Sequence, residues 1–340
     1  MATISLCMIT RNEEEFIEKC INSVRNIADE IIIVDTGSTD KTKEVCKKIA
    51  AESGNFFDLK FFDVKWNDDF SAARNESISH AAKEWVLVVD ADELIEKKDL
   101  AKIKELAENP EGFDGFSFEQ RTYISNFFEG AVKNGTDFEP AKNYPFFIPN
   151  HLVRLFRNGI GISFRHRIHE LAEDSMEEKG IKYKKTGIVL HHFGSLRGDK
   201  SISDKAEQYS RIILMQLEEF PKSARYNYQA ARMYLGKNDF TGALKYFKKA
   251  SKINPNHKLV FSEIAKIYMQ MNDKAHAIEY FKKSAKFNPD NPSPANNLAV
   301  IYMSMGKFAQ AKKLLEEQLK KSPGNRALEY NYSECLKNIK

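Results

Sequence analysis

The sequence predicts an α/β domain with a mostly parallel, Rossmann-like sheet, followed by an all-α solenoid of helical repeats. In the first two-thirds, apolar runs of strand length alternate with segments that have helical signals, a pattern typical of parallel strands joined by crossover helices. In the last third, prolines recur every 34 residues. A chain of 340 residues is long enough for two domains, each with its own core. We place these domains at residues 1–198 and 199–340.

The first elements in chain order are two strands, each followed by a helix. Residues 3–10 form an apolar run of strand length. Asn12 is predicted to cap the following helix, with Glu15 completing a capping box. Residues 31–34 are β-branched and continuous, as expected for a strand buried on both faces. A polar turn then leads into a helix that contains Cys46.

Residues 59–64 and 85–89 are predicted strands, and residues 71–82 are a predicted helix between them. Parallel sheets of this kind bind ligands beyond the carboxyl ends of their strands. The polar clusters of this sequence follow such strand ends, and they are Thr10-Arg11-Asn12, Asp35 and Asp90-Ala91-Asp92.

The last third repeats in several positions at once. The prolines are Pro221, Pro255, Pro289 and Pro323, and the same period relates three further columns: Ala231, Ala265 and Ala299; Tyr234, Tyr268 and Tyr302; Ala243, Ala277 and Ala311. Small residues let paired helices approach closely, aromatic residues fill the space between pairs, and proline ends a helix. The pattern resembles the tetratricopeptide repeat, with repeats at residues 224–257, 258–291 and 292–325 and a flanking helix on each side. Such an array either caps or dimerises the protein, or binds an acceptor peptide or a partner protein on its concave face.

Composition excludes several classes of protein. The 52 basic and 48 acidic residues give a net charge of +4, and no dense basic block is set among stacking aromatics, so we expect no nucleic-acid partner. The four cysteines lack metal-ligand spacing and are expected to be reduced, buried thiols. The N-terminus lacks the features of a signal peptide, and no apolar run approaches the roughly 20 residues that span a bilayer. A cytoplasmic protein without a transmembrane segment is therefore expected.

Neither GxGxxG nor GxxxxGK[ST] occurs, so a bound nucleotide would need another phosphate anchor. A divalent cation between carboxylates and phosphate oxygens is such an anchor. Asp90 and Asp92 directly follow the apolar residues 86–89, and a loop there can direct one carboxylate to a ribose and the other to a metal. An exposed Asp-rich turn is the alternative interpretation of the same residues.

Four segments, in this order, resemble the motifs of family 2 glycosyltransferases. They resemble more narrowly the branch that includes lipopolysaccharide-core glucosyltransferases and the S-glycosyltransferase that modifies sublancin. The segments are residues 10–14 (TRNEE), 34–40 (VDTGSTD), 70–75 (FSAARN) and 90–93 (DADE). The resemblance covers roughly residues 3–198. It implies a GT-A fold and inverting transfer from a nucleotide-diphosphate sugar, usually a UDP-sugar.

The resemblance also implies residues for the donor pocket. Asp35 is expected to meet the uracil or its ribose, with Thr10 and Arg11 in the same pocket. Arg74 is expected to lie across the base or the diphosphate. Asp90, followed by Ala91, is expected to face the ribose.

The metal and the catalytic base complete the implied site. Asp92 is expected to ligate Mn²⁺ or Mg²⁺ together with the diphosphate, and His192 in the segment HHFG completes the metal shell or only bonds a backbone carbonyl. Inverting transfer needs one base to deprotonate the acceptor. Glu170 fits that role by position, although the family's usual Glu-Asp pair is absent, and His169 is the alternative.

Residues 113–150 have no clear period and carry aromatics among Gly and Pro. A long irregular loop of this kind is either an acceptor-site lid or a segment whose aromatics fill core. These aromatics are Phe127, Phe128, Tyr144, Phe146 and Phe147.

The sequence thus predicts an enzyme that moves a hexose or N-acetylhexosamine from a UDP-sugar to a protein or peptide, such as a flagellin, or to a cell-surface glycan. A repeat-based scaffold with an inactive transferase domain is the rival hypothesis, against which the intact motif residues argue. A nucleotidyltransferase of similar fold is a third, but residues 10–14 lack the Gly-rich basic loop typical of that class.

Overall fold

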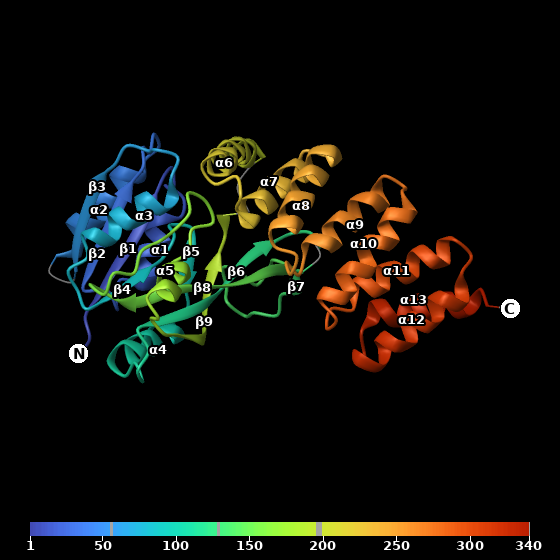
Figure 1. Ribbon diagram of the computed structural model, residues 1–340. Coiled ribbons are helices and arrows are strands. Elements are labelled where there is room, and N and C mark those ends of the chain that lie inside the picture. The colour runs from blue at the N-terminus through green and yellow to red at the C-terminus, as the bar shows by residue number, and fades with distance from the viewer. Residues whose placement is uncertain (55–56, 128–129, 195–198, 340) are drawn as a thin grey trace. The chain divides into compact units, whose positions relative to one another are not determined.

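Four parallel strands form the first half of the sheet in a computed structural model that describes residues 1–54, 57–127, 130–194 and 199–339. Their order is β3-β2-β1-β4, so β1 lies inside the sheet (Figure 1). Thr10 pairs with Asp35 at the carboxyl ends of β1 and β2, which places two of the predicted polar clusters side by side. The four strands are β1 (Ile4–Thr10), β2 (Glu30–Asp35), β3 (Asp58–Asp63) and β4 (Trp85–Val88).

The second half of the sheet is mixed rather than parallel. Its order continues from β4 as β8-β6-β9-β5, with β7 paired to β8. The β4–β8, β8–β6 and β9–β5 pairs are antiparallel, and β6–β9 is parallel. The prediction of a mostly parallel sheet therefore holds for the first four strands only. The strands of this half are β5 (Glu93–Ile95), β6 (Gly115–Ile124), β7 (Val132–Lys133), β8 (Phe146–Arg157) and β9 (Tyr183–His192).

Much of the segment 113–150 is strand, which corrects its interpretation as one long irregular loop. β6 and the start of β8 supply the two arms of an antiparallel pair. Phe147 is buried beside Tyr123, whereas Phe127 is 66% exposed, so the aromatics of this segment divide between core and surface. Phe128 lies outside the described residues.

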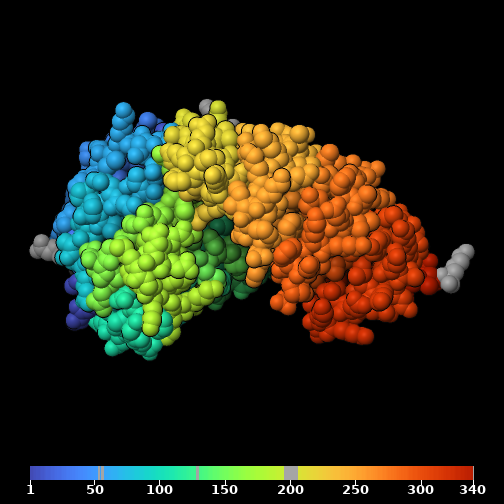
Figure 2. Space-filling view, in the orientation of Figure 1, coloured from blue at the N-terminus to red at the C-terminus, as the bar shows by residue number. Residues whose placement is uncertain are grey.

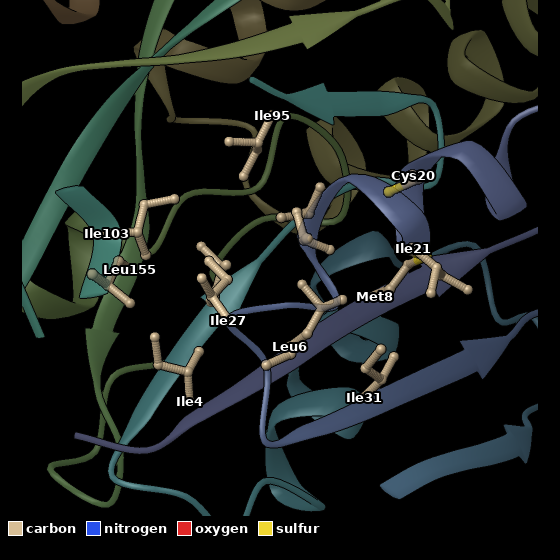
Figure 3. Close-up of a cluster of buried hydrophobic side chains, with 14 of the residues drawn as sticks. Ile4, Leu6, Met8, Cys20, Ile21, Ile27, Ile31, Ile95, Ile103 and Leu155 are labelled. Carbon is tan, nitrogen blue, oxygen red and sulfur yellow. The ribbon is translucent and has the colours of Figure 1, made fainter. Parts of the chain in front are cut away.

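Helices cover both faces of the sheet. On one face, α1 (Ile17–Val24), α2 (Thr42–Ser53) and α4 (Lys97–Glu108) pack against alternate residues of β1 and β2 (Figure 3). On the other face, apolar residues of α3 (Phe70–Ser79) and α5 (Glu173–Glu178) pack against the side chains that point the opposite way. The two-sided burial explains why β1 and β2 read as continuous apolar runs.

The predicted capping box at Asn12 is wrong. Helix α1 begins at Ile17, and its N-cap, Phe16, makes no side-chain capping bond. Asn12 instead adopts a left-handed conformation with φ 56° and bonds the loop after β2. Asn tolerates that conformation and readily bonds nearby backbone groups, so the same residue serves a turn in place of a helix start.

The chain divides into two compact units, Met1–Ile212 and Ile213–Lys340. The division falls within α6 (Asp199–Glu219). The predicted junction between residues 198 and 199 falls at the end of residues 195–198, which lie outside the described residues, and it stays a prediction. Within the part of the chain that the structure describes, no helix is both long and apolar enough to cross a membrane.

The second unit is a stack of helical pairs, drawn from yellow-orange to red in Figures 1 and 2. The alanines of both predicted columns are fully buried, as expected where paired helices meet. Each of the three repeating helical pairs ends two residues before its proline. The helices are α7 (Ala224–Gly236), α8 (Phe240–Ile253), α9 (Val260–Gln270), α10 (Lys274–Phe287), α11 (Ser293–Ser304), α12 (Phe308–Lys321) and α13 (Arg326–Lys337).

Candidate active site

Two loops interlock at the carboxyl ends of β1 and β2. The backbone N–H of Asn12 donates to Ser38 Oγ at 2.9 Å, and Asn12 Oδ1 accepts from the Thr39 N–H at 2.8 Å. The Lys41 N–H donates to Glu14 Oε2 at 3.0 Å. The segments TRNEE and VDTGSTD therefore form one rigid frame, because each fastens backbone groups of the other.

The Asp35 side chain is fully buried and faces its own turn. Its Oδ1 accepts from the backbone N–H groups of Gly37 and Ser38 at 2.9 and 2.8 Å, and Lys43 Nζ lies 3.6 Å away. In this arrangement Asp35 shapes the loop, and its predicted contact with a uracil or ribose stays a prediction. Beside it, Thr10 Oγ1 is buried with no hydrogen-bond partner among the described residues, while Arg11 is exposed.

Asp90 is held between two arginines. Arg74 Nη2 donates to Asp90 Oδ1 at 2.8 Å, and Arg154 Nη2 donates to Oδ2 at 3.0 Å. Burial opposes the ionised carboxylate, but the two guanidinium groups outweigh it and lower the pKa of Asp90 well below its usual range. The carboxylate is therefore ionised at neutral pH, and its direction is fixed from both sides. Ala91 is buried next to it.

Arg154 is a site residue that the sequence reasoning missed. It lies on β8, is 3% exposed, and bridges Asp90 to the fully buried Glu93, with Nη2 to Glu93 Oε1 at 3.1 Å. Glu93 Oε2 in turn accepts from the Asp90 N–H at 2.8 Å. A buried carboxylate of this kind needs a paired cation and hydrogen bonds, both of which it has here. The available signal was a lone arginine inside the apolar run Leu152–Phe156 of β8.

The sheet register brings Asp92 to His192. β5 pairs with β9 so that Glu93 lies opposite His192, and the Asp92 carbonyl accepts from the Phe193 N–H at 3.0 Å. His192 Nε2 lies 3.5 Å from Asp92 Oδ1, and its Nδ1 is 3.0 Å from Thr122 Oγ1. Burial disfavours the imidazolium, but the facing carboxylate of Asp92 prevails, with Glu93 and Asp90, and raises the pKa of His192 to about 9.

Asp92 and His192 fit a divalent cation as a partial ligand set. A Cβ at Gly194 would lie 2.4 Å from Asp92 Oδ2 and 2.7 Å from His192 Nε2, so the missing side chain keeps the space beside both donor atoms clear of protein. Carboxylate and imidazole both suit Mn²⁺, and carboxylate suits Mg²⁺. Among the described residues, no group of three or more His, Cys, Asp or Glu is placed to hold a metal. Further ligands would therefore have to come from a diphosphate or water.

The structure joins Glu170 to Arg74 and, through it, to Asp90. Glu170 Oε1 accepts from Arg74 Nη2 at 2.7 Å and from Arg74 Nε at 3.1 Å, so Arg74 links Glu170 to Asp90. The loop that carries Glu170 is closed by two backbone bonds between Arg165 and Leu171. His169 is exposed, has φ 53°, and lies beside the ring of Tyr209.

His191, the neighbour of His192, belongs to an aromatic cluster. It is fully buried, its Nδ1 lies 2.7 Å from the Tyr123 hydroxyl, and its Nε2 lies 3.2 Å from Glu96 Oε1. Burial lowers the pKa of His191 to about 4, against the opposing effect of Glu96. The ring stacks with Tyr123 and therefore serves the packing that supports β9.

Comparison with known families agrees with this geometry. Residues 5–162 match the family described as Glycosyl transferase family 2. Over these residues the α/β unit is similar to the family 2 glycosyltransferases. Residues 234–299 and 275–329 match the Tetratricopeptide repeat, which confirms the predicted two-part architecture of an α/β domain followed by a helical repeat array. The prediction that this is a glycosyltransferase is supported at the level of the family.

Three relatives illustrate the similarity. A TPR repeat-containing protein of Synechococcus elongatus is 30% identical over 258 residues, which are 74% of this chain and 57% of that protein. The SPbeta prophage-derived glycosyltransferase SunS of Bacillus subtilis is 26% identical over 249 residues, 73% of this chain and 53% of that protein. An uncharacterized glycosyltransferase of Rickettsia typhi is 28% identical over 216 residues, which are 62% of this chain and 66% of that protein. The chain thus spans a little over half the length of the first two relatives.

Proposed function

We propose that this protein is an inverting, metal-dependent glycosyltransferase that moves a hexose or N-acetylhexosamine from a UDP-sugar to a peptide or protein side chain. The observation that carries the proposal is the continuous set of contacts from Glu170 through Arg74 to Asp90, with Asp92 two residues further along the chain and facing His192 of β9. This set of contacts supports a donor, a cation and an acceptor base that lie close together.

In the proposed reaction, an acceptor nucleophile attacks the anomeric carbon of the sugar from the face opposite UDP. The new bond joins that carbon to the acceptor atom, and the bond to the phosphate oxygen breaks with its electron pair leaving on UDP. Asp92 and His192 would hold Mn²⁺ or Mg²⁺, which supplies Lewis-acid stabilisation of the departing diphosphate. Arg74 and Arg154 keep Asp90 ionised and oriented as an acceptor for the ribose hydroxyls.

Glu170 is the better candidate for the base that accepts the proton of the acceptor. Its Oε1 already accepts two N–H bonds from Arg74, which leaves Oε2 as the oxygen that would take the proton. Glu170 accepts hydrogen bonds from Arg74, which also donates to Asp90, whereas the ring of His169 packs against Tyr209. Position therefore supports Glu170 over His169. A cysteine acceptor, already partly ionised near neutral pH, would need less help from either.

The repeats support a protein acceptor or partner. Helical repeat arrays present extended concave surfaces on which other chains bind. A cell-surface glycan is the alternative acceptor for the same catalytic residues. A second copy of the chain is the alternative occupant of the repeat surface.

The test is UDP release from a panel of UDP-sugars, measured with Mn²⁺, with Mg²⁺ and with EDTA. The proposal expects metal-dependent hydrolysis of at least one donor, lost in Asp92→Ala and kept in Asp114→Ala, a half-buried carboxylate that directly precedes β6. If UDP release from every donor is the same with Mn²⁺, with Mg²⁺ and with EDTA, and calorimetry detects no UDP binding, the scaffold alternative is supported instead. Comparison of Glu170→Gln with His169→Ala then identifies the base, and if both transfer sugar at the normal rate, neither assignment stands.

A further inference from the structure

Three aromatic side chains from separate segments meet beside the candidate base. Trp66 lies in the loop after β3, Phe70 begins α3, and Tyr209 belongs to the first-unit part of α6. The Trp66 and Phe70 rings are 4.8 Å apart at 66°, and the Phe70 and Tyr209 rings are 5.7 Å apart at 89°. All three are half-buried. We call Trp66, Phe70 and Tyr209 the aromatic platform.

Ion pairs and hydrogen bonds fix the platform in place. Trp66 Nε1 donates to Asp68 Oδ1 at 2.7 Å, and Arg211 Nη2 donates to the same oxygen at 2.6 Å. Asp68 therefore ties the loop of Trp66 to the helix of Tyr209. Partly exposed aromatic rings held in this way are pre-organised, so a ligand that packs on them does not have to order them first.

The next carboxylate along the chain is engaged as well. Asp69 Oδ1 accepts from Ser71 Oγ at 2.7 Å and from the Ala72 N–H at 2.9 Å, which caps α3. Asp69 Oδ2 lies 3.7 Å from Arg167 Nη1. Both carboxylates next to the platform therefore help to hold it in place.

The platform lies next to the residues assigned to transfer. Phe70 and Arg74 are four residues apart on α3, so they share a face of the helix at a spacing of about 6 Å along its axis. At the other end, the ring of Tyr209 is 6.5 Å from that of His169, which precedes Glu170. An acceptor whose reacting atom reaches Glu170 would have its neighbouring group over the platform.

The three rings give the platform apolar contact area, which suits an apolar side chain of a peptide. Trp66 Nε1, Asp68 Oδ1 and Asp69 Oδ1 are engaged in hydrogen bonds within the protein. The donor nucleobase is the alternative occupant of the platform, and the fluorescence of Trp66, described below, distinguishes it from a peptide.

We propose that the aromatic platform is an acceptor subsite that binds an aromatic or large aliphatic side chain of a peptide, next to the residue that receives the sugar. The assignment rests on the proposed function for its location but makes a separate claim about binding. The subsite would give selectivity for peptides with such a side chain within a few residues of the modified position.

The test measures peptide binding without turnover. A nonapeptide library with Ser, Thr or Cys at its centre and randomised flanks is passed over the immobilised full chain in the presence of UDP and Mn²⁺, and bound peptides are sequenced. The proposal expects enrichment of aromatic and large aliphatic flanking residues on the unmodified protein. Tyr209→Ala should reduce that enrichment about two- to tenfold, the effect of a single aromatic contact. Tyr209→Phe, which keeps the ring, should retain it.

Tyr183→Ala is the matched control, an exposed tyrosine at the start of β9, and it should enrich the same peptides as the unmodified protein. Circular dichroism melting checks that each variant is folded. Equal enrichment on Tyr209→Ala and on the unmodified protein, or no apolar preference at all, would overturn the assignment. Because selection needs no sugar transfer, this result is separate from that of the UDP-release panel.

Fluorescence distinguishes an acceptor from the donor on the platform. The two tryptophans are Trp66 and the fully buried Trp85, so a binding-induced change that disappears in Trp66→Phe reports on the platform. Enriched peptides should change the emission of Trp66. A change of equal size with UDP and Mn²⁺ alone would assign the platform to the nucleobase and overturn the proposal.

Discussion

Replacing Arg154 with methionine removes the cation that the fully buried Glu93 shares with the half-buried Asp90. Methionine keeps most of the volume of the side chain but leaves Glu93, which is fully buried, without its ion pair. Asp90 keeps Arg74. Removal of one partner of a buried ion pair costs about 3–5 kcal/mol, because an uncompensated charge stays behind. For a unit of this size each kcal/mol lowers Tm by about 2–4 °C, so a fall of about 6–20 °C is expected.

Urea unfolding followed by tryptophan fluorescence reports on the unit that contains Arg154, since Trp66 and Trp85 both lie within Met1–Ile212. Arg157→Met on the same strand is the control. Arg157 pairs with the exposed Glu84 and should cost at most about 1 kcal/mol. Arg157 also lies over the Trp85 ring, so midpoints rather than intensities are compared. Adding Glu93→Gln to Arg154→Met should recover part of the loss. A cost no larger than that of Arg157→Met, or no relief from Glu93→Gln, would refute this account of the buried charges.

Three further changes have defined outcomes. Gly194→Ala places a methyl group against Asp92 Oδ2 and should weaken Mn²⁺ binding, followed by electron paramagnetic resonance, about 10- to 100-fold; unchanged binding would exclude a cation at that position. Burial opposes the ionised form of Glu30, but hydrogen bonds led by Lys60 lower its pKa below the ordinary 4.5. Its stabilisation is thus present above pH 4.5 and lost as pH falls through the folded pKa, so Glu30→Gln should cost about 1–3 kcal/mol at pH 7 and progressively less as pH falls below 4.5; a cost independent of pH would contradict this. Ala265→Leu overfills a fully buried helix crossing and should lower the stability of the repeat unit by about 1–3 kcal/mol in circular dichroism melts, whereas no change would mean that the crossing is loose.

The parts of the fold that local signals encode were predictable. An apolar run predicted β1, a continuous β-branched run predicted β2, and the proline period predicted the repeat helices. The mixed half of the sheet was not predictable, because β6 and β8 pair over a long sequence separation and their aromatics follow no simple alternation. Asn12 was misassigned because its partner, Thr39, is 27 residues away, and a capping signal cannot show a non-local competitor.

Some residues of the candidate site were likewise predictable from local sequence signals, and others were not. Asp90 and Asp92 were recognisable from their place after an apolar strand, and the β5–β9 register explains how His192 comes to lie beside Asp92. Arg154 was missed because its role depends on strand pairing, with only a lone charge in an apolar run as a signal. Tyr209 was missed because it lies on the first-unit part of α6, and the sequence suggested α6 only as a helix leading the repeats.

If Asp92 and His192 hold a cation that binds the diphosphate of a UDP-sugar, UDP binding must depend on that cation. Calorimetric titration of UDP into the full chain, with Mn²⁺ and with EDTA, measures this dependence, with Asp92→Ala as the variant and Asp114→Ala as the control. We expect UDP binding that requires Mn²⁺, is lost in Asp92→Ala and persists in Asp114→Ala. UDP binding of equal strength with EDTA, or in Asp92→Ala with Mn²⁺, would contradict it.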